Sequence, residues 1–305
     1  TARPMDAFSV RYQKGKFLFT YQLGQLDIFK SGDSSSCFEN RFFAGHRLDI
    51  ELSKNLNIGL FETIIFGGSG RHIELTYLNP LIFFHSIQLN GQADDNTFLG
   101  CDAGYYIGNK HKIYGQLLID DIQIEKKSVG DKEPNEIGYL IGFQSLGLFL
   151  SFDLQGEYLK ITNRTYNQKY LRNRYINRGE LIGHNFGSDG DRFTFSLIRW
   201  FKYSGRLALD LAYERRGEGG YDSPWTEPWR NMTVNYNEPF PTGTVEKKMS
   251  GSLGYAEFVG GHIYYDFKLG ISSYQNFNHI QAKKRTTPSF AFRISLLLST
   301  LLNIG

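Results

Sequence analysis

The sequence predicts an all-β chain that forms a transmembrane, up-and-down antiparallel β-barrel. Three observations favour this fold class. Of the 305 residues, 15% are aromatic, and 33 Gly stand against only 8 Pro. Apolar and polar residues alternate over many short segments, and tight turns alternate with long polar loops. Aromatic residues favour strands and glycine favours turns, so this composition suits a protein built from many strands.

The strand-like alternation is clearest in residues 207–214 and 262–272. One row of these segments is apolar and comprises Leu207, Leu209, Leu211, Ile263, Tyr265, Phe267 and Leu269. The opposite row carries charged side chains, among them Asp210, Glu214, Asp266 and Lys268. Because successive side chains of a strand point to opposite faces, we expect the apolar row to face lipid and the charged row to face the lumen.

Segments of this kind number about 14, and many approach the roughly 9 to 11 residues that cross a bilayer when tilted. Tight turns are predicted at 15–16, 55–57, 109–110, 145–147, 203–205 and 260–261, and longer loops at 30–45, 67–96, 162–190 and 216–246. We expect the turns in the periplasm and the loops outside the cell. A soluble sandwich or propeller is the alternative, but no propeller-length repeat is visible.

Composition also argues against other classes of protein. Mean hydropathy is −0.36, and no run approaches the roughly 18 to 20 apolar residues of a spanning helix. The net charge of +3 is too small and too interspersed for a nucleic-acid surface. Cys37 and Cys101 lack metal-ligand spacing; a disulfide is one interpretation, and two unrelated thiols are the favoured one. We expect no metal and no cofactor.

The pair Asp120-Asp121 interrupts the apolar segment 113–125. On a regular strand one of the two carboxylates would join the lipid-facing row. A β-bulge at the pair shifts the phase by one residue and removes this conflict. We therefore predict a bulge at 120 and 121, with both carboxylates pointing into the lumen near Gln116 and Gln123.

Two blocks of the sequence carry recognisable motifs. Residues 77–122 contain Leu78-Asn79-Pro80, Asp94-Asp95-Asn96, Gly100, Asp102, Tyr114-Gly115-Gln116 and Asp120-Asp121, and residues 178–193 contain Gly183, His184, Gly187 and Asp189. These blocks resemble the capsule-assembly Wzi family of outer-membrane β-barrels. The resemblance implies a barrel of about 18 strands with an occluded lumen, acting as a surface lectin. It also implies that residues 1–305 form one barrel domain from which the N-terminal part of the full protein is missing.

Candidate glycan or lumen-binding residues follow from these motifs and from an aromatic loop at 222–243. They are Asp94, Asp95, Asn96, Asp102, Tyr114, Gln116, Asp120, Asp121, Arg178, His184, Asp189, Trp225 and Trp229. Sugar rings stack on aromatic faces while their hydroxyls bond polar groups, and arginine suits acidic polysaccharide or phosphate. The alternatives are an Asx-rich turn, a structural histidine and a loop packed on itself.

The leading hypothesis is a non-enzymatic barrel of the bacterial outer membrane that binds and retains capsular or exopolysaccharide. An outer-membrane channel, or an accessory barrel of a larger export assembly, is the second hypothesis. A hydrolase is the third, but no nucleophile stands in a recognisable context. The expected partners are polysaccharide, lipopolysaccharide and outer-membrane lipid, with no nucleic acid. We expect a monomeric barrel, alone or within a larger envelope complex.

Overall fold

The computed structural model describes residues 3–30, 38–91, 94–122, 132–148, 151–201, 205–231, 236–260 and 262–296. Its strands are β1 (Asp6–Lys14), β2 (Phe17–Gln25), β3 (Phe29–Lys30), β4 (Phe38–Ser53), β5 (Leu56–Ser69), β6 (Asn96–Ile107), β7 (His111–Asp121), β8 (Glu136–Leu148), β9 (Phe152–Ile161), β10 (Ile176–Asn177), β11 (Glu180–Leu181), β12 (Gly190–Trp200), β13 (Arg206–Arg216), β14 (Glu246–Val259), β15 (Ile263–Gln275) and β16 (Lys284–Leu296). The helices are α1 (Leu75–Leu78) and α2 (Phe84–Gly91).

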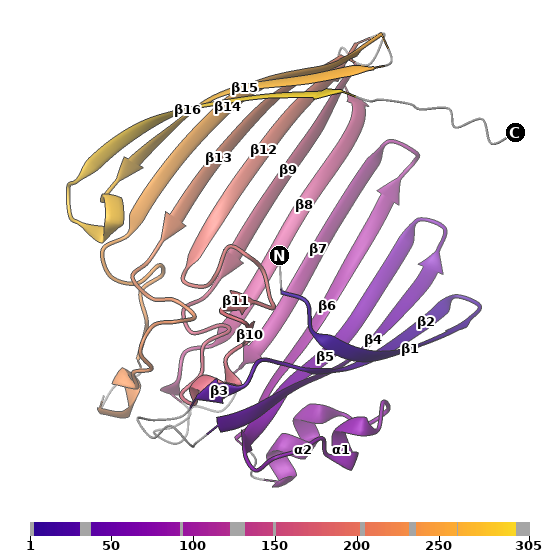
Figure 1. The fold of residues 1–305 in the computed structure, drawn as a ribbon, viewed down its shortest axis with the longest axis vertical. Helices are drawn as coiled ribbons and strands as arrows, with labels where there is room; N and C mark the ends of the chain where they lie inside the picture. The colour runs from indigo at the N-terminus through magenta and orange to yellow at the C-terminus, as the bar shows by residue number, and fades with distance from the viewer. Residues whose placement is uncertain are drawn as a thin grey trace, which may run out of the picture.

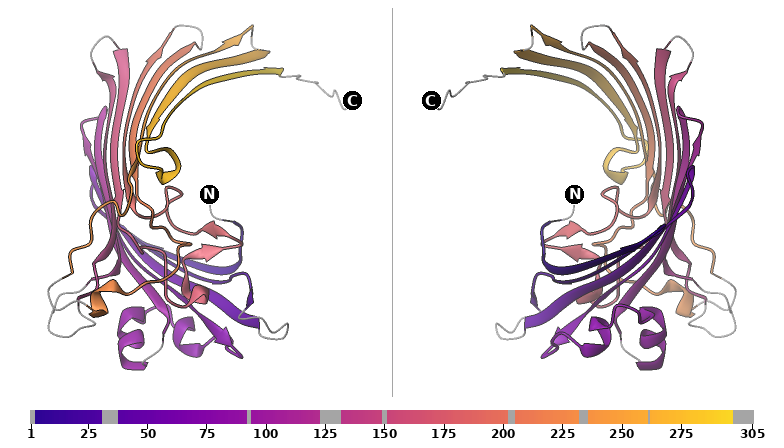
Figure 2. Two further views of the ribbon diagram at one scale, coloured as in Figure 1. Left: turned by 90° about the vertical axis from the view of Figure 1, so that its left-hand side faces the viewer. Right: turned by 90° about the vertical axis from the view of Figure 1, so that its right-hand side faces the viewer.

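Fourteen of these strands form a single antiparallel sheet, which confirms the predicted fold class and strand number. The order is β1-β2-β4-β5-β6-β7-β8-β9-β12-β13-β14-β15-β16, with β3 paired to β4, and β10 and β11 form a separate hairpin (Figure 1). Figure 2 shows that the sheet curves into an open C around this hairpin. Among the described residues no ladder joins β1 to β16. Within the same residues, no helix has the length and apolarity required to cross a membrane.

Most of the predicted turns and loops lie where the sequence placed them. Short turns join β1 to β2, β4 to β5 and β6 to β7, and the long loops gather at the opposite end of the strands. The turn predicted at 145–147 is wrong, because these residues belong to β8, which pairs irregularly with β9 between Ser145 and Leu148. The loop predicted at 30–45 is also too long. Residues 38–45 already belong to β4. The charged Arg41 makes this stretch resemble a polar loop, but its side chain binds the Arg172 carbonyl oxygen on the concave face of the sheet.

The two faces of the sheet have opposite chemistry. Leu209 stands opposite Leu197 on β12 and Leu253 on β14, and all of these side chains belong to the convex face. Asp210 belongs to the concave face, where the Lys268 ammonium lies 3.0 Å from its carboxylate. The strand registers place all seven residues of the predicted apolar row on the convex face. The predicted phase is therefore confirmed.

Buried apolar side chains form one core on each face of the sheet. The inner core joins the wall to the segment between β9 and β12, and it contains Leu26, Phe43, Ile65, Phe98, Leu159, Ile161, Tyr166, Tyr175, Leu181 and Phe186. The outer core joins the wall to α1 and α2, and it contains Tyr21, Leu23, Phe42, Ala44, Ile64, Phe66, Tyr77 and Phe84. The thin wall thus supports structure on both sides at its long-loop end.

The β-bulge predicted at Asp120-Asp121 is present. Ile119 pairs with Ile137 of β8, and Asp121 pairs with the next residue, Glu136, so Asp120 is the extra residue. The Asp120 side chain is buried on the concave side, where its Oδ2 accepts a hydrogen bond of 2.8 Å from the Tyr166 backbone N–H. Its predicted inward direction is therefore confirmed.

Some of the sequence-based predictions fall outside the described ranges. These are Gln123, expected beside the aspartate pair, Cys37, expected as one member of a thiol pair, and residues 203, 204 and 261 of the turns predicted at 203–205 and 260–261. Cys101 lies on β6 as a free thiol. A disulfide between the two cysteines therefore stays an untested alternative.

Replacement of Asp120 by alanine should lower the free energy of unfolding by about 1 to 3 kcal/mol, because the buried Tyr166 amide would lose its acceptor. Urea unfolding of the refolded barrel, followed by tryptophan fluorescence, measures this change. Asp222→Ala is the matched control, since Asp222 is an exposed loop carboxylate. Equal unfolding midpoints for the two variants would show that the Asp120 contact does not hold the structure together.

Candidate functional site

Residues 162–189, which we call the plug, leave the wall after β9 and lie inside the C of the sheet (Figure 2). Among the wall side chains that bind the plug backbone, Arg41 makes several such contacts and is only 1% exposed. Its guanidinium donates hydrogen bonds to the carbonyl oxygens of Arg172 (2.5 Å), Arg174 (2.8 Å) and Ile176 (2.9 Å). Plug carbonyls that lack a strand partner are satisfied in this way, so the plug occupies a defined position.

Asp95, a predicted glycan-binding residue, is buried in an ion pair. Its carboxylate accepts two hydrogen bonds from the Arg71 guanidinium, one of them 3.0 Å long, and a third of 2.6 Å from the Tyr77 hydroxyl. These contacts tie the segment before β6 to the start of the helical segment. Asp95 has almost no surface left for a sugar.

The neighbours of Asp95 attach the plug to the wall. Asn96 is buried and donates a hydrogen bond of 3.1 Å from Nδ2 to the Asn173 carbonyl oxygen. Asp94 forms an ion pair with Arg172, and its own carbonyl oxygen accepts a hydrogen bond from the Asn173 amide. Of the three adjacent residues, Asp94 alone has an appreciably exposed side chain.

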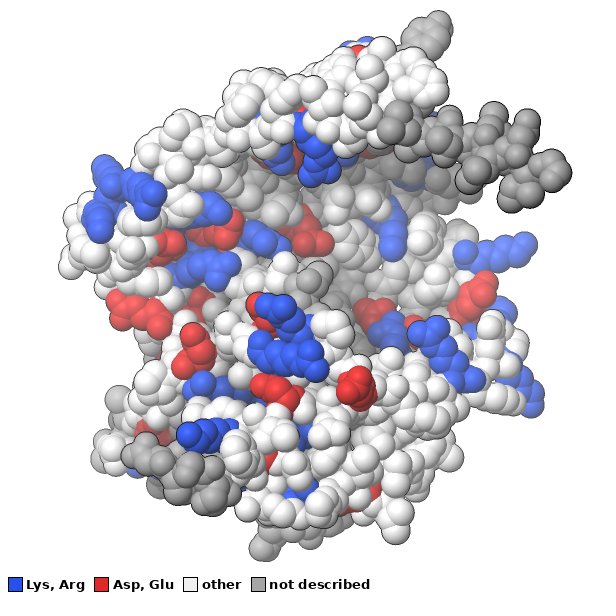
Figure 3. Space-filling model, viewed as in Figure 1, with Lys and Arg blue, Asp and Glu red and all other residues white. Residues whose placement is uncertain are grey.

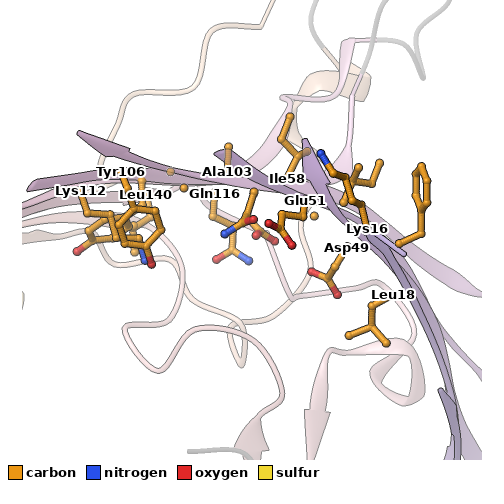
Figure 4. Close-up of a pocket in the computed structure, with 18 of the residues that line it drawn as sticks. Lys16, Leu18, Asp49, Glu51, Ile58, Ala103, Tyr106, Lys112, Gln116 and Leu140 are labelled. Atoms are coloured by element: carbon orange, nitrogen blue, oxygen red, sulfur yellow. The ribbon is translucent and has the colours of Figure 1, made fainter. Parts of the chain in front are cut away.

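A polar cavity of about 700 Å³ occupies the concave face at the tight-turn end. Its lining contains the predicted residues Asp102, Tyr114 and Gln116, together with Lys16, Asp49, Glu51, Lys112 and Glu157. Figure 4 shows the side chains of Asp49, Glu51 and Gln116 on the same side of the sheet. Asp102 is paired with Arg47 at 2.6 Å, and the Tyr114 hydroxyl donates to Glu157 at 3.1 Å. This wall is wet and ion-paired.

Asp189 closes the plug and holds the next loop. It is fully buried, and its Oδ2 accepts a hydrogen bond of 2.8 Å from the Gly219 backbone N–H. Thr242 donates to the same carboxylate from its backbone N–H, at 2.9 Å, and from its hydroxyl. Asp189 therefore joins three segments that are distant in sequence, and it has no catalytic contact with His184.

His184 and Arg178 occupy different environments within the plug. The His184 Nδ1 accepts a hydrogen bond of 3.1 Å from the Phe186 backbone N–H. Burial lowers the pKa of the His184 imidazole, and the Arg192 charge lowers it further, which keeps the ring neutral at neutral pH. It lines a cavity of about 350 Å³ below the plug. Arg178 is exposed at the turn between β10 and β11.

The loop between β13 and β14, residues 217–245, packs part of its aromatic cluster internally. Trp229 is only 1% exposed, so the expectation of an exposed ring is wrong for this residue. The Arg164 guanidinium lies 4.8 Å from the centre of the Trp229 ring and 5.9 Å from that of Trp225. Glu238 holds the same guanidinium at 2.6 Å. A charged plug residue thus organises the aromatic part of this loop.

Trp225 stays partly exposed and lines a cavity of about 380 Å³ at the long-loop end. Tyr236, Asn163 and Glu218 line the same cavity. One aromatic face is thus combined with amide, carboxylate and phenol groups, which is the chemistry that a sugar requires. Within the described ranges, no group of three or more His, Cys, Asp or Glu side chains is arranged to hold a metal ion.

The sequence did not reveal Arg41 or Arg164 as organising residues. Arg164 belongs to a stretch with three other arginines, Arg41 has only Arg47 nearby, and neither stands in a motif. Their importance depends on contacts with residues more than 70 positions away, such as Glu238 for Arg164 and Arg172 for Arg41. No local signal distinguishes them from a solvated arginine.

The raised pKa of Glu133, in the loop between β7 and β8, predicts that the stability of the protein depends on pH. Burial and the nearby Asp121 raise its pKa to about 7, against the opposing charge of Arg164. A carboxyl group whose pKa is raised by folding stabilises the protein below its unfolded pKa, and this contribution is lost as pH rises towards 7. Between about pH 4.5 and 7, Glu133→Gln should therefore reduce the decline in stability with pH. Urea titrations at several pH values measure the decline, and an unchanged slope would contradict this assignment.

Comparisons with known proteins agree with this architecture. A solved structure, Wzi of Escherichia coli, is described as an outer-membrane protein involved in Group 1 capsule assembly and as a carbohydrate-binding β-barrel. It aligns with a TM-score of 0.61 and 15% sequence identity over 98% of this chain and 63% of its own. The chain thus spans 63% of the length of that structure. An outer-membrane channel from Pseudomonas putida F1 aligns with a TM-score of only 0.31, at 13% identity over 97% of this chain and 95% of its own, too low to support a shared fold.

A search of curated proteins found no match. The family model for the capsule assembly protein Wzi, in contrast, matches residues 1–288, nearly the whole chain. This match includes the wall up to β16, the plug and the loop 217–245. It therefore confirms the resemblance drawn from the two sequence blocks, and the chain belongs to the capsule assembly protein Wzi family of outer-membrane β-barrels.

Proposed function

We propose that this chain binds capsular or exopolysaccharide at the outer surface of the outer membrane and retains it without chemical conversion. Family membership supports the role in capsule assembly, and the relative from Escherichia coli is a carbohydrate-binding barrel. The lipid of the membrane would contact the convex face of the sheet, and the long-loop end would lie outside the cell. The barrel needs no second subunit in this proposal.

The observation that carries the proposal is the cavity lined by Trp225. It combines a partly exposed indole with the Asn163 amide and the Glu218 carboxylate at the long-loop end. The Asn163 side-chain oxygen Oδ1 accepts a hydrogen bond of 2.9 Å from the Arg164 backbone N–H, which fixes the side chain. A sugar that stacks on the indole would meet hydrogen-bonding groups at its edge.

The plug supports retention rather than transport. It packs against the inner core and receives hydrogen bonds from Arg41, while Asp120 accepts one from its backbone. The polar cavity of about 700 Å³ is lined by residues of the wall at its tight-turn end. A polymer bound at the loop cavity would therefore stay at the surface.

Trp225→Ala should weaken binding of the purified capsular polysaccharide about tenfold, equivalent to about 1.4 kcal/mol, because the stacking face is lost. Biolayer interferometry with the refolded barrel measures the affinity. Trp200→Ala is the matched control, since Trp200 is an exposed tryptophan on β12 at the tight-turn end.

The two variants should differ in polysaccharide affinity, with only Trp225→Ala weakened. If Trp225→Ala and Trp200→Ala bind polysaccharide as tightly as the unmodified protein, the loop cavity is not the glycan site. If both lose binding to the same extent, the loss reflects a general defect, and the assignment to Trp225 fails as well.

A further inference from the structure

A row of basic side chains crosses the convex face of the wall at its long-loop end. The ladders from β9 through β12 to β16 place one residue of each strand side by side, and Arg215 of β13 shares its face with Leu209, an even number of residues away. In strand order these neighbours, which we call the basic row, are Lys160, Asp191, Arg215, Lys247, Gln275 and Lys284. Adjacent strands lie about 4.8 Å apart, so the cations of the row are spread over roughly 24 Å of the rim.

The carboxylate of the basic row is already paired. Arg215 donates a hydrogen bond of 2.9 Å from Nε to Asp191 Oδ1 and another of 2.5 Å from a terminal amino group to Oδ2. The Tyr158 hydroxyl donates to the same Oδ2 at 2.9 Å. Asp191 is thus buried among its neighbours, whereas the Arg215 side chain is 36% exposed and stays accessible from outside the wall.

The three lysines of the basic row carry charge that no carboxylate of the described residues neutralises. Lys247 and Lys284 are exposed, and no ion pair within the described part of the chain engages them or Lys160. The Lys160 ammonium lies 4.1 Å from the centre of the Phe240 ring, a cation–π contact that keeps its charge. Figure 3 shows basic side chains where Figure 1 places the hairpin between β15 and β16. This rim of the wall is thus positively charged.

The rows beneath the basic row follow the order of a membrane interface. The first of them begins with the aromatic residues Tyr158, Phe193 and Tyr213. The next two rows contain Gly156, Phe195, Leu211, Gly251, Ile271 and Pro288, and then Leu154, Leu197, Leu209, Leu253, Leu269 and Phe290. An aromatic girdle marks the boundary of the apolar band in outer-membrane barrels, so cations directly above it lie at the level of lipid head groups.

The rim at the tight-turn end has different chemistry. Glu257 of β14 lies opposite Tyr265 of β15, which in turn lies opposite Ile294 of β16. The Glu257 carboxylate accepts hydrogen bonds from the hydroxyls of Tyr255, at 2.8 Å, and of Tyr265. Strands β14 to β16 therefore present a carboxylate towards one leaflet of the membrane and lysines towards the other. Such a wall distinguishes the two leaflets by the charge of their head groups.

We propose that the basic row binds the phosphate groups of lipid A in the outer leaflet. Lipid A carries a phosphate at each end of a disaccharide, and guanidinium and ammonium groups form charge-assisted hydrogen bonds to phosphate oxygens. Cations spaced along the row suit two separated phosphates, while the acyl chains lie against the apolar rows beneath. A phospholipid offers one phosphate and would engage only part of the row. The choice of leaflet rests on the proposed function, which places the long loops outside the cell.

The test is native mass spectrometry of the purified, detergent-solubilised protein with added lipid A, in buffer without divalent cations. Lys247→Gln combined with Lys284→Gln should reduce the retained lipid A at least tenfold, because two cations that contact phosphate are lost. Lys14→Gln combined with Lys54→Gln removes the same charge at exposed positions of the tight-turn end and should retain lipid A normally. Heat-modified gel mobility establishes that each variant is folded. Equal retention of lipid A by the two double variants would overturn the assignment to the basic row.

Two further lipids test the selectivity of the unmodified protein. Lipid A from which the phosphates have been removed, and phosphatidylglycerol with its single phosphate, should each be retained at least tenfold less than lipid A. Equal retention of the dephosphorylated lipid would overturn phosphate recognition. Equal retention of phosphatidylglycerol would overturn the choice of lipid A.

Polysaccharide affinity separates this site from the proposed glycan site. The variant with Lys247→Gln and Lys284→Gln should bind polysaccharide as tightly as the unmodified protein, and Trp225→Ala should retain lipid A normally. A loss of polysaccharide affinity in the lysine variant, without a loss of lipid A, would show that the row binds glycan instead. A failure of either proposal is thus distinguishable from a failure of the other.

Discussion

The buried guanidinium of Arg41 is the interaction on which the arrangement of the inner face depends. It joins the carboxylate of Asp27, at 2.7 Å, to three carbonyl oxygens of the plug. Burial lowers the stability of any charged group, and a guanidinium tolerates it only when its donors are used. Asp120 performs the reverse role by accepting a plug N–H. The irregular backbone of the plug is thus satisfied by side chains of the wall, and the loops above it rest on a fixed base.

On the convex face of β12 to β14, charged side chains lie near the two ends of the strands. On β13 the outward row runs from Leu207 to Tyr213 and then reaches Arg215, which pairs with Asp191 of β12 at 2.5 Å. At the opposite end, Glu257 of β14 accepts hydrogen bonds from two tyrosine hydroxyls. The charges of this part of the wall thus lie at its two rims, and they bracket an apolar belt of about the length expected for a tilted transmembrane strand.

The two sides of the same wall differ in chemistry at the long-loop end. The loop cavity beside Trp225 offers an aromatic face with hydrogen-bonding groups, whereas a groove below α2, beside Phe83, is apolar apart from the His46–Glu62 pair and a thiol. Both lie at the long-loop end.

The sequence by itself determined the fold class, the phase of the strands and the bulge at Asp120-Asp121, because these depend on local alternation and on the cost of a charge in lipid. It could not determine which candidate residues are accessible. Asp95, Asn96, Asp189 and Trp229 looked like ligands, but tertiary structure buries them in contacts with Arg71, Asn173, Gly219 and Arg164. The groove below α2 was equally invisible, since its lining is drawn from several strands and a helix. Such contacts join distant residues, and only the folded chain decides them.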